Sequence, residues 1–554
     1  MRLDRRRNGT APAGAAAVLL LAAAGLTAEG RQPPADWPQW RGPTRDGVAP
    51  SQKWSWKWPS QGPPKLWTAD AGQGYGSLIV SAGRVFAFGR LGEIREGRKV
   101  TRPRGDYVRC LDAETGKVLW TVRVGEGRGE FASATPCTDG QAVFSVTYNG
   151  NVTALDARTG REIWKVNVVR KHRTTRGGFH GIANSPLLVG RVLVLAQGVG
   201  LDKRTGQLVW QERDAMTRCH ASPVPCPVAA APGVIVFGRE LMRLDPATGK
   251  VLWRQEEVRR LGSGYMDPIV VGDRVVVLSG SGVNRFRFTA GTVAADNGGL
   301  VRKGYGYCGA GDMANPVRWK GYLYAPRSAD SDRSGMFADN PDLSRSRLEC
   351  FEIGTMRKMW SHSGICGTPI VCDGKLIIQG QWGEIRVVEA TPAGYRELAN
   401  ARVSAPRSGN PRNPFGRASF ATPVLLSGRL YCRFHAGEVI CLDLRRDAPA
   451  SDRPAEGRRI VGEVCTVAGV LSAAPADGPD YVVGLLTETP PPGGGAKVYT
   501  LCARKHNDNP GAIERIAALV ARKARVSVTG TLLDANRLSV NAIVPANAAP
   551  EKLG

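Results

Sequence analysis

Short apolar runs interrupted by turn residues recur along the chain and predict a series of antiparallel β-hairpins. In each, a small or polar residue, usually followed by Pro, opens an apolar run that leads through a Gly-containing turn into a second apolar run. Apolar runs of about four to eight residues bounded by turn residues are typical of strands, so the pattern predicts an all-β fold. Eight segments have this pattern, and they open at Ser77, Thr135, Ser185, Ser222, Asp267, Asn315, Thr368 and Thr422.

A second pattern, with a fixed internal spacing, follows most of these hairpins. An Asp is followed by Thr at +3, Gly at +4 and Trp at +8 in the copies LDAETGKVLW, LDARTGREIW, LDKRTGQLVW and LDPATGKVLW. A worn fifth copy keeps Glu352, Thr355 and Trp360 at the same offsets. A period in the low forties is typical of a β-propeller with one four-stranded blade per copy. The aspartates are 44, 46 and 43 residues apart, at Asp112, Asp156, Asp202 and Asp245.

The residues of this Asp motif suit a tight turn between two strands. The Asp carboxylate accepts from backbone amides two residues on, and Gly supplies a positive φ at no steric cost. A large flat side chain at one place in each copy suits packing between neighbouring blades. We therefore assign a structural docking role to the tryptophans Trp120, Trp164, Trp210, Trp253 and Trp360.

Counting the hairpins as inner strands and the Asp motif as the start of the outer strand predicts an eight-bladed propeller over residues 64–446. The fifth and seventh units lack the Trp. The eighth ends at EVICLDLR with no Trp motif after it, and Pro64–Trp67, which precedes the first hairpin, is expected to supply its missing outer strand. Such a closure removes an open sheet edge and locks the ring.

The segments before the propeller have a different composition. Residues 1–28 place arginines before a short apolar run, as in a secretory signal peptide. That run is shorter than the roughly 20 residues that span a bilayer, and no later segment is apolar enough, so we expect no transmembrane segment. Residues 29–63 are rich in Pro and Trp. Hydrophobic anchoring to the body and carbohydrate stacking both remain open for Trp37, Trp40, Trp54, Trp56 and Trp58.

Beyond the propeller, a Pro/Ala/Asp-rich stretch at residues 447–459 predicts a linker. Residues 460–546 then read as three strands, a helix at 511–523 and two further strands. This order matches a small OB-fold-like barrel. A small α+β appendage is the alternative.

Net charge and cysteine usage bear on partners. The chain of 554 residues has a net charge of +26, which favours anionic polysaccharide, lipid headgroups or acidic proteins as partners; a generally basic solvated surface is the alternative. With a signal peptide, nucleic acid is not expected as a partner.

The 12 cysteines form no C-x-x-C pair, so zinc, iron–sulfur and haem sites have no support. Cys219 and Cys226 either form a disulfide or stay as buried thiols.

The residues that enter the inner strands are expected to converge at one mouth of the ring, where ligands commonly bind. Two interpretations are open for them: a water-filled polar lining, or a site that binds a metal ion or shuttles protons. The sequence identifies no catalytic residue and no metal ligand set. The candidates for binding a cofactor are His180, His220, Tyr265, Asp267, Asp312 and Asn315, with Tyr75, Phe131, Asn184 and Phe420 beside them.

The Asp motif resembles the blade motif of the pyrroloquinoline quinone (PQQ)-type eight-bladed propellers. The opening DWPQWRGPTRDGV and the later GPPKLW are similar to the start of exported bacterial PQQ-like repeat proteins. The resemblance implies the fold and, for the docking tryptophans, the family's structural role. It leaves two functional classes, since fold alone does not fix function.

One class is the quinoprotein dehydrogenases, which use PQQ and calcium to oxidise alcohols or sugars and carry an adjacent cysteine pair above the quinone. This chain has no Cys-Cys dipeptide, so the family's catalytic residues transfer to no position here. The other class resembles the outer-membrane assembly propeller lipoprotein and is not enzymatic. We therefore expect an exported periplasmic or extracellular binding or scaffold protein with a protein or polysaccharide partner and no cofactor; the alternative is a dehydrogenase that uses PQQ and calcium.

Overall fold

The structure is a computed structural model. It describes residues 36–91, 94–96, 99–101, 105–127, 133–175, 181–216, 220–226, 233–237, 240–255, 266–272, 274–279, 282–289, 292–303, 314–327, 346–404, 419–434, 437–445, 464–472, 482–488, 498–502, 525–532 and 537–545. The predicted signal peptide, linker and C-terminal helix lie outside these ranges. None of the helices in these ranges has the length and hydrophobicity that crossing a membrane requires.

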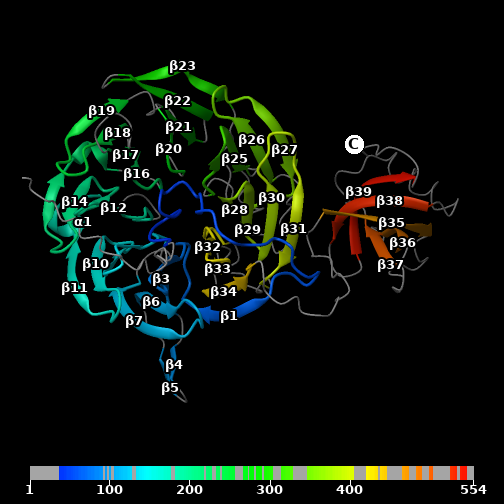
Figure 1. Cartoon of the computed structure of the whole chain (residues 1–554), viewed down its shortest axis with the longest axis horizontal. Helices are drawn as coiled ribbons and strands as arrows, with labels where there is room; N and C mark the ends of the chain where they lie inside the picture. The colour runs from blue at the N-terminus through cyan, green and yellow to red at the C-terminus, as the bar shows by residue number, and fades with distance from the viewer. Residues whose placement is uncertain are drawn as a thin grey trace, which may run out of the picture. The chain divides into compact units, whose positions relative to one another are not determined.

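Eight antiparallel four-stranded sheets stand around a common centre, which confirms the predicted all-β propeller (Figure 1). We number them in chain order. Sheet 1 contains β2 (Ile79–Ser81), β3 (Arg84–Arg90), β6 (Asp106–Asp112) and β7 (Val118–Gly125). Sheet 2 contains β8 (Cys137–Thr138), β9 (Ala142–Val146), β10 (Asn151–Asp156) and β11 (Glu162–Asn167). Sheet 3 contains β12 (Leu187–Val189), β13 (Val192–Leu195), β14 (Val199–Asp202) and β15 (Leu208–Gln211).

The next three sheets repeat this plan. Sheet 4 contains β16 (Val224–Pro225), β17 (Val234–Phe237), β18 (Leu241–Leu244) and β19 (Val251–Gln255). Sheet 5 contains β20 (Ile269–Val271), β21 (Arg274–Ser279), β22 (Gly282–Thr289) and β23 (Thr292–Lys303). Sheet 6 contains β24 (Val317–Trp319), β25 (Tyr322–Arg327), β26 (Arg347–Glu352) and β27 (Lys358–Ser363).

The last two sheets complete the ring. Sheet 7 contains β28 (Gly367–Cys372), β29 (Lys375–Gly380), β30 (Glu384–Glu389) and β31 (Glu397–Arg402). Sheet 8 contains β32 (Val424–Leu426), β33 (Arg429–Arg433), β34 (Glu438–Asp443) and β1 (Lys65–Asp70). The N-terminal strand β1 pairs antiparallel with β34, with Trp67 opposite Cys441. The predicted closure of the last sheet by the N-terminal strand is therefore confirmed.

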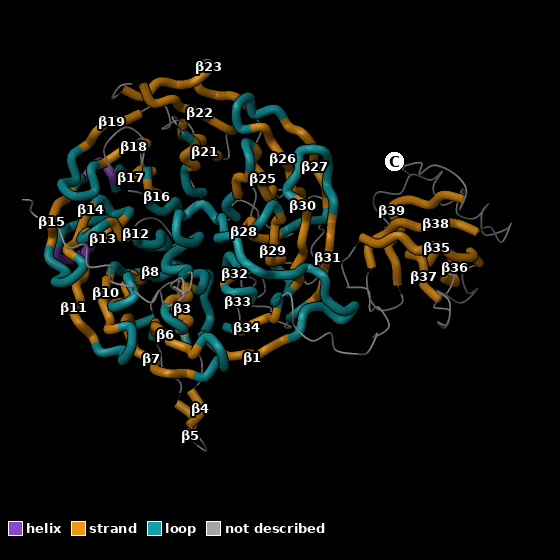
Figure 2. The backbone as a smooth tube through the Cα atoms, viewed as in Figure 1, coloured by secondary structure: helices purple, strands orange, loops and turns teal. Residues whose placement is uncertain are grey.

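Few elements lie outside this plan. A hairpin of β4 (Ile94–Glu96) and β5 (Lys99–Thr101) extends from sheet 1, and two short helices are α1 (Val168–Lys171) and η1 (Arg213–Ala215). Figure 2 shows that strands and loops make up nearly all of the traced backbone. A separate closed barrel follows the propeller in sequence, with strand order β35-β36-β37-β39-β38. Its strands are β35 (Val464–Ser472), β36 (Val482–Glu488), β37 (Val498–Cys502), β38 (Arg525–Leu532) and β39 (Arg537–Pro545).

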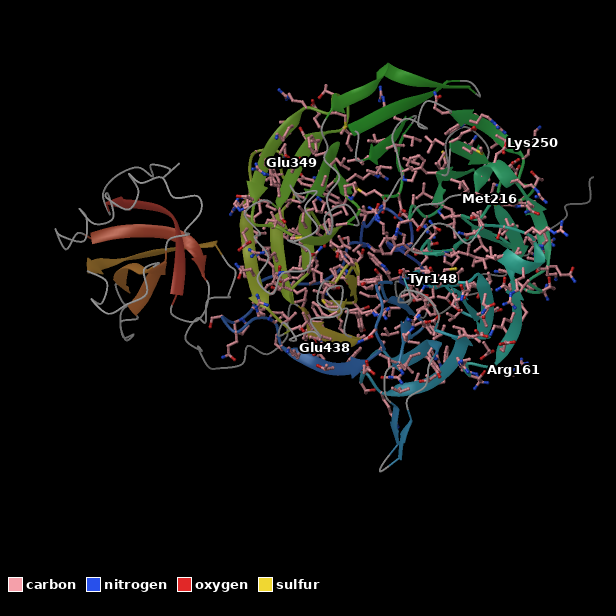
Figure 3. All side chains as sticks on the ribbon, turned by 180° about the vertical axis from the view of Figure 1, so that it is seen from behind. Tyr148, Arg161, Met216, Lys250, Glu349 and Glu438 are labelled. Atoms are coloured by element: carbon pink, nitrogen blue, oxygen red, sulfur yellow. The ribbon has the colours of Figure 1, made fainter. Side chains whose placement is uncertain are left out.

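The Asp motif forms the turn that its sequence predicts. Asp156 Oδ1 accepts from the backbone N–H of Thr159 at 2.7 Å and of Arg158 at 3.1 Å, and from the Thr159 hydroxyl at 2.7 Å. Gly160 follows with φ 76°. Figure 3 places Arg161, the next residue of this motif, at the outer rim of the ring. In the worn copy Met356 takes the Gly position with φ 57°.

Four of the five motif tryptophans, and Trp67 of the closing strand, join their sheet to the next one. Trp164 Nε1 donates to the carbonyl of Lys203 at 2.9 Å, and its ring lies on Gly206, where a Cβ would come within 2.5 Å of Trp164 Cε3. Glycine is therefore required there by the close approach as well as by its φ of 70°. The same indole bond to the next sheet joins Trp67 to Ala113, Trp120 to Ala157, Trp210 to Pro246 and Trp360 to Thr391.

Candidate functional site

The polar residues that open the eight hairpins lie at the inner edge of the ring, and seven of them are joined in a hydrogen-bonded chain; we call the eight residues the girdle. In six of its joints the backbone N–H of one member donates to a side-chain oxygen of a neighbouring member, and all eight members are buried. A side chain with an oxygen acceptor is needed at each such position, which explains the Ser, Thr, Asp and Asn pattern. The joints are Ser77 to Thr135, Thr135 to Ser185, Ser185 to Ser222, Ser222 to Asp267, Asp267 to Asn315, and Thr422 to Ser77, at 2.7–3.0 Å.

The girdle accounts for two of the candidates expected at the mouth of the ring. Asp267 and Asn315 lie together, because the Asp267 N–H donates to Asn315 Oδ1 at 2.7 Å. His220 is partly buried two residues before Ser222. Among the secondary candidates, Asn184 Nδ2 donates to the carbonyl of Ala221 at 2.7 Å, and the rings of Tyr75 and Phe420 lie 5.3 Å apart.

Other candidates lie outside the described residues, so the structure does not place them beside the girdle: His180, Tyr265, Asp312 and Phe131. Within the described ranges, no three His, Cys, Asp or Glu side chains are grouped as a metal site requires. Cys219 is likewise outside these ranges, while Cys226 is a buried thiol. Among the described residues, the choice between a water-filled polar lining and a site for a metal ion or proton transfer therefore rests on Asp267 and Asn315.

Residues 36–58, which we call the strap, cross the centre of the ring (Figure 1, dark blue). Backbone hydrogen bonds join the strap to sheet 1 through Trp37 and Val80, at 2.7 and 3.0 Å, and to sheet 7 through Val371, at 2.8 and 2.9 Å. Trp37 is fully buried, and Trp54, 4% exposed, donates to Asp373 Oδ2 at 3.1 Å. Hydrophobic anchoring, one of the two interpretations of this segment, is thus confirmed for Trp37 and Trp54.

A third tryptophan of the strap binds the acidic member of the girdle. Trp40 Nε1 donates to Asp267 Oδ2 at 2.7 Å, while Oδ1 accepts from the Ser222 N–H at 2.7 Å. Both carboxylate oxygens of Asp267 therefore hold hydrogen bonds from the chain itself. A hydroxyl at this position has one oxygen and does not serve both donors with separate atoms.

Two arginines of the strap are almost completely buried. Arg45, 2% exposed, donates to the carbonyls of Pro186 at 2.7 Å and Ser185 at 3.1 Å. Arg41, 4% exposed, donates to the carbonyl of Asp46 at 3.0 Å and to that of Pro316. Burial lowers the pKa of Arg41 and lowers the pKa of Arg45 to about 10, although the negative charge of Asp267 opposes both shifts.

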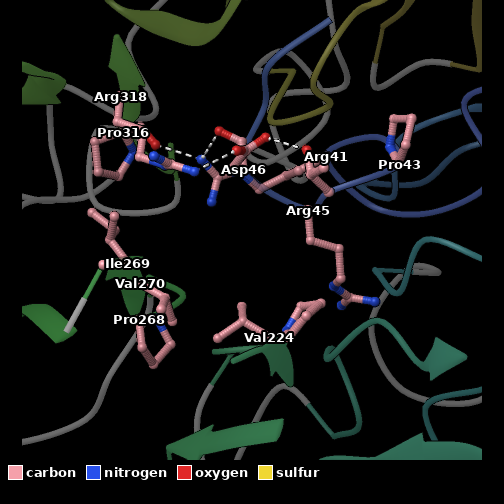
Figure 4. A pocket seen from close by; sticks show the side chains of 13 residues that line it. Arg41, Pro43, Arg45, Asp46, Val224, Pro268, Ile269, Val270, Pro316 and Arg318 are labelled. Carbon is pink, nitrogen blue, oxygen red and sulfur yellow. Dashed lines mark hydrogen bonds and ion pairs between the residues drawn. The ribbon is translucent and has the colours of Figure 1, made fainter. Parts of the chain in front are cut away.

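A cavity of about 580 Å³ lies between the strap and the innermost strands of sheets 4, 5 and 6 (Figure 4). Asp46 lies at its polar side, where Oδ1 accepts from the Thr44 hydroxyl at 2.6 Å and Oδ2 faces Arg318 Nη2 at 3.2 Å. The other walls are mostly apolar. They are formed by Val224, Pro225, Pro268, Ile269, Val270 and Pro316.

Sequence reasoning did not identify the polar side of this cavity. The strap was interpreted through its tryptophans, and Arg41, Arg45 and Asp46 were not among the candidates. The available signal is the run RGPTRDG, in which two arginines and an aspartate stand beside glycines and a proline in a segment with no strand or helix pattern. Charged residues in such an irregular segment need partners elsewhere in the fold.

A row of apolar side chains is exposed on the outer strands of sheets that are neighbours in the ring. Each member precedes a docking tryptophan by one residue, so the repeat places it at the same height in each sheet. Isolated exposed apolar residues are ordinary, and each of these stands on a different sheet, so what sets them apart is their repetition at one position of the motif. The row consists of Leu66, Leu119, Ile163 and Val209, with exposures of 36%, 44%, 44% and 38%.

Comparison with known proteins gives both sequence and structural similarity. The family profile described as outer membrane protein assembly factor BamB matches residues 62–222 and 199–301. The outer membrane protein assembly factor BamB of Burkholderia pseudomallei is 29% identical over 134 residues, 24% of this chain and 34% of that protein. The tetrathionate hydrolase of Acidithiobacillus ferrooxidans is 25% identical over 194 residues, 30% of this chain and 36% of that protein. The chain thus spans about a third of the length of these relatives.

A solved structure, the quinohemoprotein alcohol dehydrogenase of Pseudomonas putida HK5, covers 78% of this chain and 83% of its own, with 12% identity and a TM-score of 0.50. At this identity the likeness concerns the fold alone. The repeated Asp motif, the ring of four-stranded sheets and the matching profile agree with one another. The chain is therefore similar to the PQQ-like repeat β-propellers, through its fold and through the repeats at residues 62–301.

Proposed function

We propose that this chain is a non-enzymatic binding or scaffold protein that is exported to the bacterial cell envelope. The observation that carries the proposal is the strap: it crosses the centre of the ring, and Trp40 and the girdle occupy both carboxylate oxygens of Asp267. A dehydrogenase of this fold needs an open site for its quinone and a carboxylate available as a base. The absence of a Cys-Cys dipeptide from the sequence supports the same conclusion.

The proposed partner is a protein. The outer membrane protein assembly factor among the relatives is an envelope assembly component by its own description, and this chain shares part of its repeats. The row of exposed apolar residues supports a protein partner, because a polysaccharide is usually bound by polar and aromatic side chains. Eight sheets acting as blades of one closed ring would present this row on a rigid platform.

The C-terminal barrel is proposed to be an OB-fold-like module. Five strands closing on each other, with one parallel pair between β37 and β39, fit that class of barrel. Such barrels bind extended polymers on one face, so this module is the proposed place for a polysaccharide contact. The corresponding measurement is the binding of envelope polysaccharides to the C-terminal barrel.

The test combines cofactor titration with crosslinking in cells. The mature protein is titrated with PQQ in the presence of calcium and assayed for dye-linked oxidation of alcohols and sugars, with an authentic quinoprotein dehydrogenase as positive control. We expect neither binding nor activity. Stoichiometric PQQ binding at micromolar concentration, with dye reduction that depends on it, would contradict the proposal.

In the second arm a photocrosslinking amino acid replaces Leu119 or Ile163, members of the exposed row. We expect a discrete adduct with an envelope protein that disappears when Val209 is changed to Glu. Lys250, which Figure 3 places at the rim of the ring in a motif turn outside the row, is the control position. Adducts of equal yield at all positions, or none at the row, would refute the row as the partner surface.

A further inference from the structure

We propose that the cavity between the strap and sheets 4 to 6 binds a carboxylate group carried on an apolar body. The inference rests on the cavity itself and not on the scaffold role. The volume of about 580 Å³ is within the range of about 300–1,000 Å³ of small-ligand sites. A concave apolar surface with a few convergent polar groups is the usual composition of such sites.

The polar side of the cavity has an excess of positive charge. Three guanidinium groups line it, from Arg41, Arg45 and Arg318, against one carboxylate, from Asp46. Asp267, which accepts from Trp40 of the strap, offsets one of the two remaining positive charges, which leaves a surplus of about one. Most acceptors that the strap arginines have found are neutral carbonyl oxygens, which solvate a cation but do not neutralise it.

One N–H donor of Arg45 has no hydrogen-bond acceptor among the described residues. Its two terminal nitrogens are bound to the carbonyls of Pro186 and Ser185, but Nε, in a side chain that is 2% exposed, has no acceptor in the part of the chain that the structure describes. A buried donor without a partner is uncommon in folded proteins and calls for an acceptor. Figure 4 shows Arg45 along one side of the cavity and Arg318 and Pro316 on the opposite side.

Arg318 is the group that is free to engage a ligand. Its side chain is 43% exposed and its one described ionic contact is to Asp46, itself 20% exposed. An exposed ion pair of this kind is weak, so a ligand carboxylate competes for the guanidinium at small cost. The planar fork of Arg matches a carboxylate with two parallel hydrogen bonds, which favours this anion in particular.

The apolar walls decide what the carboxylate is attached to. Val224, Ile269 and Val270 face the cavity from two sheets, with Pro225, Pro268 and Pro316 between them. They offer no side-chain donors for the additional oxygens of a phosphate, and Asp46 opposes a dianion. Burial of an aliphatic or aromatic body against these walls is favourable because it removes apolar surface from water. The ligand is therefore a monocarboxylate with an apolar body, either a free acid or an acidic side chain between apolar residues of a peptide.

Calorimetric titration of the full mature protein tests the inference. Octanoate is the probe, with acetate lacking the body, octanol lacking the charge and octyl phosphate carrying the other anion. We expect octanoate to bind at least about 10-fold more tightly than each of the three, and more weakly as salt is raised. A blocked pentapeptide with one glutamate between leucines, compared with its glutamine counterpart, separates the two sources of the carboxylate.

Variants localise the binding. Arg318→Gln and Val270→Asp are each expected to weaken octanoate binding at least about 10-fold, because one removes the fork and the other places a negative charge in the wall. Arg191→Gln is the matched control, since Arg191 forms an exposed ion pair with Asp202 at 3.0 Å on sheet 3. Melting curves establish that all three variants fold.

Three results would overturn the inference. They are the failure of both octanoate and the peptide to bind at millimolar concentration, octanoate affinity that Arg318→Gln leaves unchanged, and octyl phosphate binding as tight as octanoate. None of these depends on PQQ or on crosslinking, so the cavity and the scaffold role fail or hold separately.

Discussion

The contact between Trp164 and Gly206 predicts a specific coupling between two substitutions. Gly206 has φ 70°, and a Cβ there would lie 2.5 Å from Cε3 of Trp164 in the neighbouring sheet. Gly190, in the hairpin turn of the same sheet, has φ 57° but nothing within 4 Å of its Cβ position. Replacing each by Ala separates the cost of the left-handed backbone from the cost of the clash.

The magnitudes follow from these two terms. Gly190→Ala should lower the free energy of unfolding by about 1–2 kcal/mol, the cost of a left-handed conformation for a residue with a Cβ. Gly206→Ala should add about 1–3 kcal/mol for overpacking against the indole. Trp164→Ala should cost about 3–5 kcal/mol, through the lost packing and the lost bond to the Lys203 carbonyl.

The double variant distinguishes docking from simple burial. Once Trp164 is Ala, Gly206→Ala has no ring to meet and should cost only the backbone term of about 1–2 kcal/mol, so the pair shows a coupling of about 1–3 kcal/mol. Urea unfolding followed by circular dichroism measures all four proteins, with the m-value as a check that the unfolded state is unchanged. If Gly206→Ala matches Gly190→Ala, or if the two substitutions are additive, the indole does not dock on this glycine.

Three further predictions concern the strap, the closure and pH. Trp40→Phe removes the donor to Asp267 Oδ2 and should cost about 1–3 kcal/mol in thermal or urea unfolding, whereas Trp58→Phe, at a partly buried position, should cost less. Deleting residues 1–70 removes β1 together with the strap and should expose the edge at β34 and the strap's contacts, measured as faster proteolysis and aggregation; an unchanged digestion pattern would contradict both the closure and the anchoring of the strap. Stability under reducing conditions should fall between about pH 8.5 and 10, by about 1 kcal/mol per buried thiol, because the folded state keeps protons that the unfolded state releases above a pKa of about 9. A free energy of unfolding that does not change over this pH range would contradict the prediction. Burial raises the pKa to about 12 for the thiols of Cys110, Cys137, Cys366 and Cys441.

The arginines set the upper end of that pH window. The pKa of Arg45 is lowered to about 10, so above that pH the unfolded state holds the proton that the folded state has lost. This change stabilises the folded state as pH rises and opposes the effect of the thiols. The comparison is therefore made below pH 10, where the thiols dominate.

Local features of the propeller were predictable from the sequence because they depend on local chemistry. The Asp motif specifies its own turn through Asp156, Thr159 and Gly160, and repetition then specifies the sheets. The closing strand at Trp67 was predictable for a similar reason, since the last unit lacked one strand and the chain had one unassigned apolar segment. Repetition converts weak local signals into a fold.

The candidate site was less predictable because it depends on contacts between distant segments. Trp40 and Asp267 are 227 residues apart, and Arg45 meets Pro186 over 141 residues. The strap has no periodicity, so its sequence gave no register against the sheets. The polar residues that open the hairpins were recognised as a pattern, but their mutual bonding appears only once the sheets stand in a ring.

Asp267 explains why the strap, the girdle and the cavity occur together. Six other girdle positions carry Ser or Thr and one carries Asn. A hydroxyl there would have to accept from both the Ser222 N–H and the Trp40 indole through one oxygen, and an amide would set its own N–H against one of these donors. Only a carboxylate has two acceptor oxygens for these two donors, and its burial requires positive charge nearby. Arg41 and Arg45 of the strap supply it, and the charge that Asp267 does not neutralise faces the cavity. The same residue that fastens the strap therefore also accounts for the anion preference that we assign to this pocket.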